Sequence, residues 1–305
     1  MTMLSGSTFD LKRAHAAISV VRQLDLSRVS IDEIKVILAP AIEGRIVSAP
    51  ILDPGTSVFR ARIVTRPSHI SELSHPPATV APMGRVNRSG APVLYCSASR
   101  EGALFEVNPT VSDTVVIAEW KTTAPMVVNH VGYSQNAFND LGSRRTHGSW
   151  ANRPVDEPGG PEHGEVTDFL ATTFVRRIAP GETADFYKIS IAIAEALFAQ
   201  DLFHGLMYPT IAMAANSDNV AIKAAFADQH LEFVKAEFFR VDAVREMGFE
   251  VLPLDVAKEV DNDGALKWKG RPNQLTVTQD RPLILTAENG RWVARDVSGC
   301  IVEPD

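Results

Sequence analysis

The stretch "GRVNRSGAPVLYCSASREGALFEV", residues 84–107, places a short strand directly before a short helix. The apolar run over residues 91–97 has the length and composition of a strand. Residues 99–108 predict a helix, for which Ser99 is a suitable N-cap. The polar side chains at the borders of these elements need a separate explanation: Arg85, Tyr95 and Glu106.

Two helices are predicted on the N-terminal side of this stretch. Apolar residues at helical spacing indicate the first helix, over residues 9–24. The second is expected over residues 30–44, where Ser30 can cap the start, acidic residues occupy the first turn and Gly44 follows the end. We therefore expect residues 1–50 to form an N-terminal helical segment.

The rest of the chain predicts a mixture of strands, helices and loops. Residues 57–64 alternate apolar and polar side chains, as a half-buried strand does. Residues 66–92 are expected to be mostly loop, and so is the polar stretch 130–165, whose length is typical of a functional or mobile loop. The other predicted elements are strands within 114–122 and 203–212, helices within 164–178 and 185–200, and a connection followed by a strand within 219–241.

The C-terminal part differs in character from what precedes it. Short segments of strand type within residues 259–305 flank Asn289-Gly290, a dipeptide in the position of a hairpin turn. We expect a small β appendage there and a main domain over residues 51–258. The expected fold class is α+β.

Composition allows an ordinary core and argues against some classes of protein. Of the 305 residues, 45% are hydrophobic, and the formal net charge of −7 argues against a protein whose main task is non-specific binding to nucleic acid. No apolar run approaches the roughly 20 residues that span a bilayer, and a secretory signal pattern is missing. Two cysteines, Cys96 and Cys300, do not make a disulfide framework. We expect a cytoplasmic protein with no membrane or nucleic-acid partner.

Common catalytic motifs are absent from the sequence. It contains no GxxxxGK[ST] loop, GxGxxG turn, HExxH helix or GxSxG elbow, the usual local signatures of P-loop NTPases, Rossmann domains, zincin proteases and α/β-hydrolases. The eight histidines do not group at metal-ligand spacing. The nearest cluster is Glu162, His163 and Glu165, which a solvated loop explains better, so we expect no metal site.

Several separate pieces of the sequence share a pattern, in which a polar side chain borders a strand or helix beside small or apolar neighbours. They are FRAR at 59–62, GRVN at 84–87, the strand with Tyr95, ALFEV at 103–107, YKISIAIA at 187–194, YPT at 208–210 and NVAI at 219–222. In order and spacing these pieces resemble the RES-domain family over about residues 57–242.

The resemblance implies a fold, a reaction and partners. The family is named for an arginine, a glutamate and a serine, and it includes the toxin half of Xre–RES toxin–antitoxin pairs. Its implied fold is a RES, ADP-ribosyltransferase-like mixed sheet core. The implied substrate is NAD⁺, attacked at the nicotinamide ribose by water (glycohydrolase) or by inorganic phosphate (phosphorolase), with no prosthetic group. An antitoxin is an implied partner, and a homo-oligomer is left open.

The resemblance also places the family's site residues on positions of this chain. The arginine falls on Arg60, with Arg62 close by, and the glutamate falls on Glu106. The serine falls on Thr210, a departure that keeps the hydroxyl but adds a methyl group and stiffens χ1. Ser190 resembles a family position too, although a helix serine packed against the sheet explains it better. The implied catalytic residues are Arg60, Glu106 and Thr210, and the implied NAD⁺-binding residues are Arg62, Arg85, Asn87, Tyr95, Tyr208 and Asn219.

Elementary chemistry gives these residue types a use. Arginine presents a planar fork of donors that suits the pyrophosphate of NAD⁺. Breaking the bond between nicotinamide and ribose builds positive charge on the sugar, and a carboxylate at Glu106 would stabilise that charge. The ring of Tyr95 could stack on a flat base.

Ordinary explanations stand beside these roles. Arg60 could be a surface residue of its strand, Glu106 could lie on the solvated face of its helix, and Tyr95 could belong to the core. In the long polar stretch, Arg144 and Arg145 could close over a substrate or have no role. Two further functions stay open, namely transfer of ADP-ribose to a macromolecule and a catalytically weakened NAD-binding or interaction module.

Overall fold

A ten-stranded mixed sheet runs through the part of the chain that the structure describes. The computed structural model describes residues 9–45, 49–145, 149–150, 153–154, 161–178, 184–198, 201–245, 248–270, 284–288, 291–295 and 300–301. The strand order is β1-β5-β8-β9-β3-β2-β4-β10-β11-β12. β5 and β8 pair in parallel, and the other neighbouring strands of this sheet pair antiparallel.

The strands of the main sheet vary from two to fifteen residues in length. They are β1 (Ile51–Leu52), β2 (Ser57–Ile63), β3 (Val93–Ser97), β4 (Thr114–Thr122), β5 (Met126–His130), β8 (Gly205–Pro209), β9 (Asp218–Lys223), β10 (Leu231–Arg245), β11 (Gly248–Val260) and β12 (Leu266–Trp268). Two separate pairs are β6 (Ser149–Trp150) with β7 (Arg153–Pro154) and β13 (Ile284–Glu288) with β14 (Arg291–Arg295).

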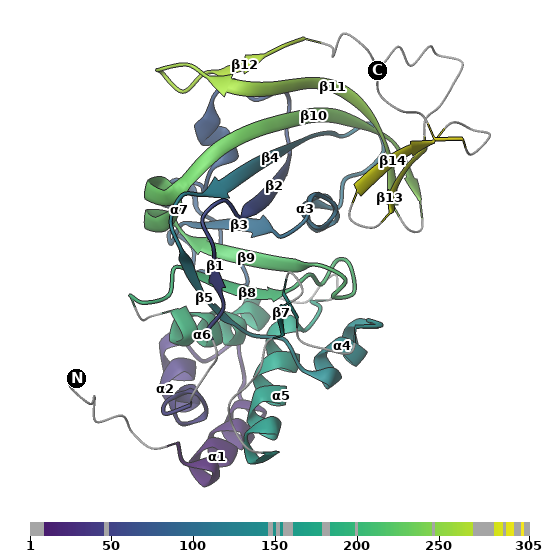
Figure 1. Ribbon diagram of the computed structural model, residues 1–305. Coiled ribbons are helices and arrows are strands. Elements are labelled where there is room, and N and C mark those ends of the chain that lie inside the picture. Colours follow the sequence, from purple (N-terminus) through teal and green to yellow (C-terminus); the bar gives the residue numbers. More distant parts are fainter. Residues whose placement is uncertain are drawn as a thin grey trace.

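Helices gather mainly at one end of the sheet. In Figure 1, α1, α2, α5 and α6 lie below the half that contains β5, β8 and β9, whereas β4, β10, β11 and β12 form the opposite end. The helices are α1 (Leu11–Val21), α2 (Ile31–Ile42), α3 (Arg100–Val107), α4 (Gln135–Leu141), α5 (Pro161–Val175), α6 (Tyr187–Phe198) and α7 (Ala224–His230). The α+β class expected from the sequence is confirmed.

The N-terminal helices form as their sequence pattern predicts. At the start of α2, the Ser30 side chain accepts a hydrogen bond from the Glu33 N–H at 3.2 Å, and the Glu33 carboxylate accepts one from the Ser30 N–H at 2.7 Å. Ile34 and Leu38, on the inner face of α2, are fully buried in the same cluster as residues of α5 and α6. The segment therefore packs on the body of the protein through an ordinary amphipathic face.

Ion pairs add to this attachment of α2. Arg88, in the loop before β3, donates to Asp32 of α2 at 2.9 Å and to Glu195 of α6 at 3.0 Å. Lys35 of α2 donates to the same Glu195 carboxylate at 2.7 Å. These contacts join the N-terminal helices, the loop before β3 and α6.

Several elements differ from the sequence-based expectation. The interval 219–241 contains the strand β9, the helix α7 and then β10, because the apolar run from Asn219 is a strand buried on both faces rather than a connection. α4 lies within the expected loop 130–165, and two short 3₁₀ turns, Ile70–Leu73 and Ala78–Val80, lie within 66–92.

The C-terminal part is also more closely joined to the main sheet than the sequence indicates. β11 forms a long antiparallel pair with β10, and β12 continues the same sheet beyond residue 259. β13 and β14 pair antiparallel with Glu288 opposite Arg291, as a hairpin requires, whereas Asn289-Gly290 lies outside the described residues.

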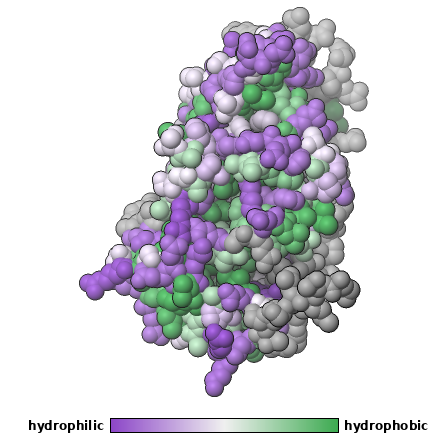
Figure 2. Space-filling model, turned by 90° about the vertical axis from the view of Figure 1, so that its left-hand side faces the viewer, coloured by the Kyte–Doolittle hydropathy of each residue, from purple (hydrophilic) through white to green (hydrophobic). Residues whose placement is uncertain are grey.

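The length and apolar character of the described helices test whether one of them could cross a membrane. No helix in the described part of the chain combines the length and the apolar character that crossing a bilayer needs. On the face drawn in Figure 2, hydrophobic residues are scattered among hydrophilic ones. Single exposed hydrophobic residues of this kind are ordinary for a protein surface.

One buried histidine lies at the end of β5. His130 is 6% exposed, its ring lies 5.9 Å from the Tyr133 ring, and its Nδ1 has no hydrogen-bond partner among the described residues. Burial, with a smaller contribution from the charge of Arg45, lowers the pKa of His130 from 6.5 to about 4. The folded protein therefore holds this ring in the neutral form at neutral pH.

This burial predicts a pH dependence of stability. Because the unfolded chain binds the His130 proton more readily, the free energy of unfolding falls as the pH drops from about 6.5 toward about 4, by up to about 3 kcal/mol. Urea denaturation at about pH 7 and about pH 5 should show a loss of about 2 kcal/mol from this group, and His130→Gln should remove it. His15→Gln, at a partly exposed histidine, is the control, and an unchanged pH dependence in His130→Gln would contradict the prediction.

Candidate active site

The candidate site lies where the main sheet opens between β2 and β3. β2 pairs with β4 along its whole length, from Ser57 to Ile63, but with β3 only through Phe59 and Ser97. No other residues of the two strands are paired with one another. A cavity of about 290 Å³ results, lined by Phe59, Arg60, Ala61, Tyr95, Cys96, Ser97, Ala103, Glu106, Val107, Tyr208 and Asn219.

A single row of paired residues across four strands forms one wall of this cavity. Phe59 of β2 lies opposite Ser97 of β3, Ser97 opposite Asn219 of β9, and Asn219 opposite Tyr208 of β8. Side chains that are directly opposite in neighbouring strands project from the same face of a sheet. The register of β2, β3, β9 and β8 therefore brings residues that are up to 160 positions apart to one cavity.

The helix α3 supplies the carboxylate. Ser99 caps α3 by accepting a hydrogen bond from the Gly102 N–H at 3.0 Å, as its sequence predicts. A Cβ at Gly102 would overlap the Ser97 hydroxyl, so glycine allows α3 to begin close to β3. One turn later, the exposed Glu106 carboxylate accepts a hydrogen bond from the Asn219 amide at 2.8 Å. This bond holds the carboxylate at the rim of the cavity.

Arg60 brings a buried positive charge to the same cavity. Its guanidinium donates to the Tyr95 carbonyl at 3.1 Å, which bridges β2 and β3 where their backbone pairing has stopped. The Arg60 Nε is buried without a hydrogen-bond partner, and no described carboxylate forms an ion pair with this side chain. Burial lowers the pKa of Arg60. A buried, incompletely paired guanidinium is costly unless an anion binds to it.

Asn219 leaves a second polar atom of the cavity unpaired. Its amide nitrogen is used by Glu106, but its Oδ1 is buried and has no partner among the described residues. The cavity thus combines an unpaired donor on Arg60, an unpaired acceptor on Asn219 and the Glu106 carboxylate. Buried polar groups are nearly always satisfied, so this combination favours a polar ligand with both donor and acceptor groups.

Two tyrosines line the cavity in different ways. The Tyr95 hydroxyl accepts a hydrogen bond from the Val86 N–H at 3.0 Å and donates one to the Asn87 Oδ1 at 2.6 Å. Burial raises the pKa of Tyr95 to about 12 and that of Tyr208 well above its ordinary value. The Tyr208 hydroxyl has no hydrogen bond to a described residue. Both phenols are therefore neutral at physiological pH. Of the two described hydroxyls, that of Tyr95 forms hydrogen bonds with the loop before β3.

Asn87 and Arg85 belong to that loop rather than to the cavity lining. Asn87 is buried and donates to the Pro82 and Arg88 carbonyls at 2.8 and 2.9 Å, so its side chain holds the loop together. The Arg85 guanidinium donates to the carbonyls of Phe174 and Arg176 at the end of α5. Burial lowers the pKa of Arg85, and nearby groups including the Glu106 carboxylate oppose this effect. Arg85 thus lies within electrostatic reach of Glu106.

Arg62 and Thr210 also lie away from the cavity lining. Arg62 donates to the Glu72 carbonyl in the first 3₁₀ turn. Thr210 is fully buried, and its hydroxyl donates to the Ser217 carbonyl at 3.1 Å, in the turn between β8 and β9. Five of the nine predicted site residues therefore share the cavity: Arg60, Tyr95, Glu106, Tyr208 and Asn219. The roles of all nine residues remain predictions.

A buried ion pair next to the site was not expected from the sequence. Arg145 donates to both oxygens of Asp218, at 2.7 and 3.1 Å, and the Tyr133 hydroxyl donates to the same carboxylate at 2.9 Å. Asp218 directly precedes Asn219 at the start of β9, so this cluster helps to fix the residue that holds Glu106. The sequence leaves open whether Arg145 closes over a substrate or has no role, and nothing local connects it with residue 218.

Two residues of the Glu162, His163 and Glu165 cluster make contacts with the N-terminal part of the chain. His163 stacks on Phe9 with ring centroids 4.5 Å apart, and Glu165 pairs with His15 at 3.5 Å. The side chain of Glu162 lies outside the described residues. Among the residues that the structure describes, no group of three or more His, Cys, Asp or Glu side chains could hold a metal ion.

Ser190 has a structural explanation. It is buried on α6, and its hydroxyl donates to the Tyr187 carbonyl one turn earlier at 3.0 Å. A helix serine packed within the core accounts for this position.

The tyrosine contacts predict an asymmetry between two similar substitutions. Tyr95→Phe removes the partner of the Val86 N–H and of the Asn87 Oδ1, so the free energy of unfolding should fall by about 1–3 kcal/mol. Tyr208→Phe removes a hydroxyl that has no described partner and should cost clearly less. Urea denaturation of both variants tests this, and equal losses would contradict the assigned contacts.

Comparison with known proteins places the chain in a family. The family model "RES domain" matches residues 58–242, which is more than half of the 305 residues and includes all nine predicted site residues. A search of curated proteins found no match. The matched region extends from β2 into β10 and contains every strand that lines the cavity. This chain belongs to the RES-domain family.

Proposed function

We propose that this protein cleaves the bond between nicotinamide and ribose in NAD⁺, with water or inorganic phosphate as the acceptor. RES-domain proteins are associated with NAD⁺-related toxin activity. The observation that carries the proposal is that the Glu106 carboxylate and the incompletely paired Arg60 guanidinium line one cavity. An anion-binding group and a carboxylate are the two elements that this reaction needs.

The size of the cavity supports binding of one half of the dinucleotide. Its volume of about 290 Å³ lies just below the range of about 300–1,000 Å³ for pockets that hold a whole ligand. In the proposal, the nicotinamide and its ribose occupy the cavity between the rings of Tyr95 and Tyr208. The Arg60 Nε donates to the nearest phosphate, and the Asn219 Oδ1 accepts from the nicotinamide carboxamide or a ribose hydroxyl. The adenosine half lies outside the cavity.

The chemistry follows from the charge that develops on the sugar. The C1′–N bond breaks and its electron pair goes to the nicotinamide nitrogen, which neutralises the pyridinium ring. The ribose gains oxocarbenium character, which the Glu106 carboxylate stabilises more strongly than it stabilises the ground state. A water or phosphate oxygen then donates an electron pair to C1′. Attack by water gives ADP-ribose and releases one proton, and attack by phosphate gives the corresponding ADP-ribose phosphate.

Thr210 has a positioning role in this proposal. Its hydroxyl and N–H both bond to the Ser217 carbonyl, which closes the turn that joins β8 to β9. Tyr208 and Asn219 lie on these two strands and line the cavity. The threonine hydroxyl therefore acts through the backbone, and the family's serine would be able to make the same bond.

Glu106→Gln provides the direct test. The amide keeps the size of the side chain but removes its charge, so nicotinamide release from NAD⁺ should fall by at least about 100-fold. Glu101→Gln, on the same helix but outside the cavity lining, is the matched control and should keep the wild-type rate. Chromatography of the reaction products measures both, with circular dichroism to verify folding. Wild-type protein that binds NAD⁺ without releasing nicotinamide would overturn the proposal.

The same assay identifies the acceptor. Parallel reactions with and without inorganic phosphate distinguish hydrolysis from phosphorolysis by their products. If nicotinamide is released only when a cell extract is present and ADP-ribose appears on a macromolecule, the protein is instead an ADP-ribosyltransferase.

We also propose that the protein acts as the toxin of a toxin–antitoxin pair, with the antitoxin covering the cavity. Expression in a bacterial host should then slow growth and lower cellular NAD⁺, because the enzyme consumes a common cofactor. Glu106→Gln should relieve both effects, and Glu101→Gln should not. Growth curves with NAD⁺ measurement test this, and equally harmless wild-type and Glu106→Gln proteins would contradict it.

A further inference from the structure

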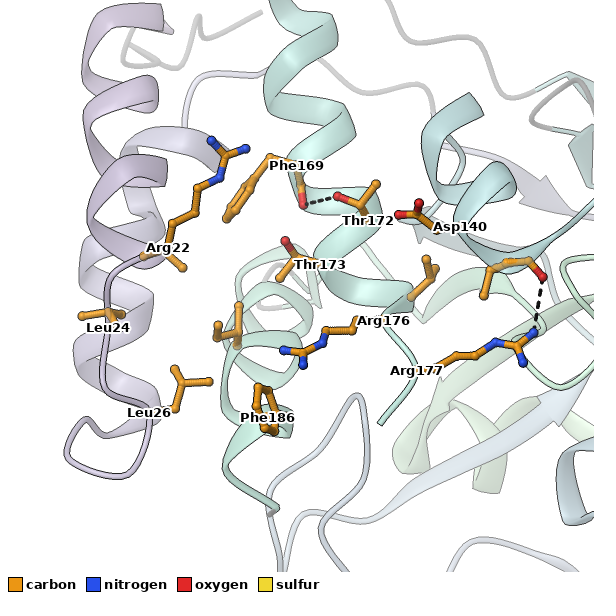
Figure 3. A pocket seen from close by; sticks show the side chains of 14 residues that line it. Arg22, Leu24, Leu26, Asp140, Phe169, Thr172, Thr173, Arg176, Arg177 and Phe186 are labelled. Atoms are coloured by element: carbon orange, nitrogen blue, oxygen red, sulfur yellow. Dashed lines mark hydrogen bonds between the residues drawn. The ribbon is translucent and has the colours of Figure 1, made fainter. Parts of the chain in front are cut away.

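A second cavity, of about 640 Å³, lies between the N-terminal helices and the end of α5. Its lining shares no residue with the candidate active site. Figure 3 shows side chains from the α1–α2 connection on one wall and from α5 and its C-terminal end on the other. This volume falls within the range of small-molecule sites, which is about 300–1,000 Å³.

Three arginines give this cavity its chemical character. Arg22, at the end of α1, lies with its guanidinium carbon 5.4 Å from the centre of the Phe169 ring. Arg176, just after α5, lies 4.1 Å above the Phe186 ring, and Arg177 donates to the Leu141 carbonyl at 3.3 Å. Aromatic faces and a carbonyl thus hold guanidinium groups around the cavity.

The charge of the lining is opposite to that of the whole protein. The lining contains three arginines and one carboxylate, Asp140, which gives a formal charge of +2 in a chain of net charge −7. Two threonines, Thr172 and Thr173, add hydroxyl groups on the α5 wall. The Thr172 hydroxyl donates to the Asp168 carbonyl at 2.8 Å, so its oxygen can still accept a hydrogen bond. Guanidinium and hydroxyl groups that line one cavity are suited to phosphate oxygens.

We propose that this cavity binds a small molecule that carries a chain of two or more phosphate groups. Arg22 and Arg176 come from different elements, so an extended polyanion can contact both, whereas a single phosphate would contact fewer of the arginines. Leu24, Leu26 and Phe186 provide apolar surface for a base or another flat group attached to the phosphates. The proposal does not depend on the reaction assigned to the other cavity.

Isothermal titration calorimetry of the full chain tests this with pyrophosphate and ATP as probes. Arg22→Gln and Arg176→Gln should each weaken pyrophosphate binding by about tenfold or more. These variants keep the backbone carbonyl of Arg176 to which Arg85 donates. Arg28→Gln, at a largely exposed arginine of the same α1–α2 connection, is the matched control and should stay within about twofold of wild type. Affinity should also decrease with added salt.

The outcomes separate this site from the candidate active site. Binding that survives Arg60→Gln but is weakened by Arg22→Gln and Arg176→Gln supports the proposal. Tighter binding of ATP than of pyrophosphate supports it as well and assigns the apolar wall to the base. The proposal is overturned if neither probe binds at millimolar concentration, if Arg28→Gln weakens binding as much as Arg22→Gln, or if Arg60→Gln alone abolishes binding. Binding of an acidic protein segment in place of both probes would likewise overturn it.

Discussion

The candidate site depends on the separation of β2 from β3 after one residue pair, Phe59 with Ser97. A continuous pairing of these strands would leave no room for a cavity in the middle of the sheet. Where the pairing stops, the Arg60 guanidinium bridges the strands by donating to the Tyr95 carbonyl. The same opening lets α3, which starts directly after β3, place Glu106 at the rim. The cavity, the buried cation and the carboxylate are thus consequences of one local change in strand pairing.

The polar groups of the site are held by one another and by residues next to the cavity. Asn219 holds Glu106, and the neighbouring Asp218 is fixed by Arg145 and Tyr133. The Tyr95 ring is fixed through its hydroxyl to Val86 and Asn87 in the preceding loop. Among the described residues of the cavity lining, Arg60 Nε and Asn219 Oδ1 are buried without a hydrogen-bond partner, which is uncommon for an ordinary core.

Arg85 interacts with residues of both cavities described above. Its guanidinium donates to the Arg176 carbonyl, and Arg176 lines the cationic cavity beside the N-terminal helices. The Arg85 guanidinium also interacts electrostatically with Tyr208 and Glu106 in the candidate active site. The connection between the N-terminal helices forms one wall of the cationic cavity. The opposite wall includes Arg176, to which Arg85 donates a hydrogen bond. The Arg88–Glu195–Lys35 ion pairs and the buried face of α2 hold the N-terminal helices in this place.

The sequence by itself determined the class of fold, the helices α1 to α3, the caps of α2 and α3, the strand β2 and the family, because these depend on local periodicity, caps and the order of short motifs. Through the resemblance to that family, it also predicted as site residues five of the residues that line the cavity. It did not predict β9, α7, β11 or the Arg145–Asp218 pair, nor that Arg62, Asn87 and Thr210 bond to backbone carbonyls outside the cavity. Only the tertiary structure decided these points. Strand register and buried ion pairs join residues far apart in the chain, and no local pattern specifies which of them meet.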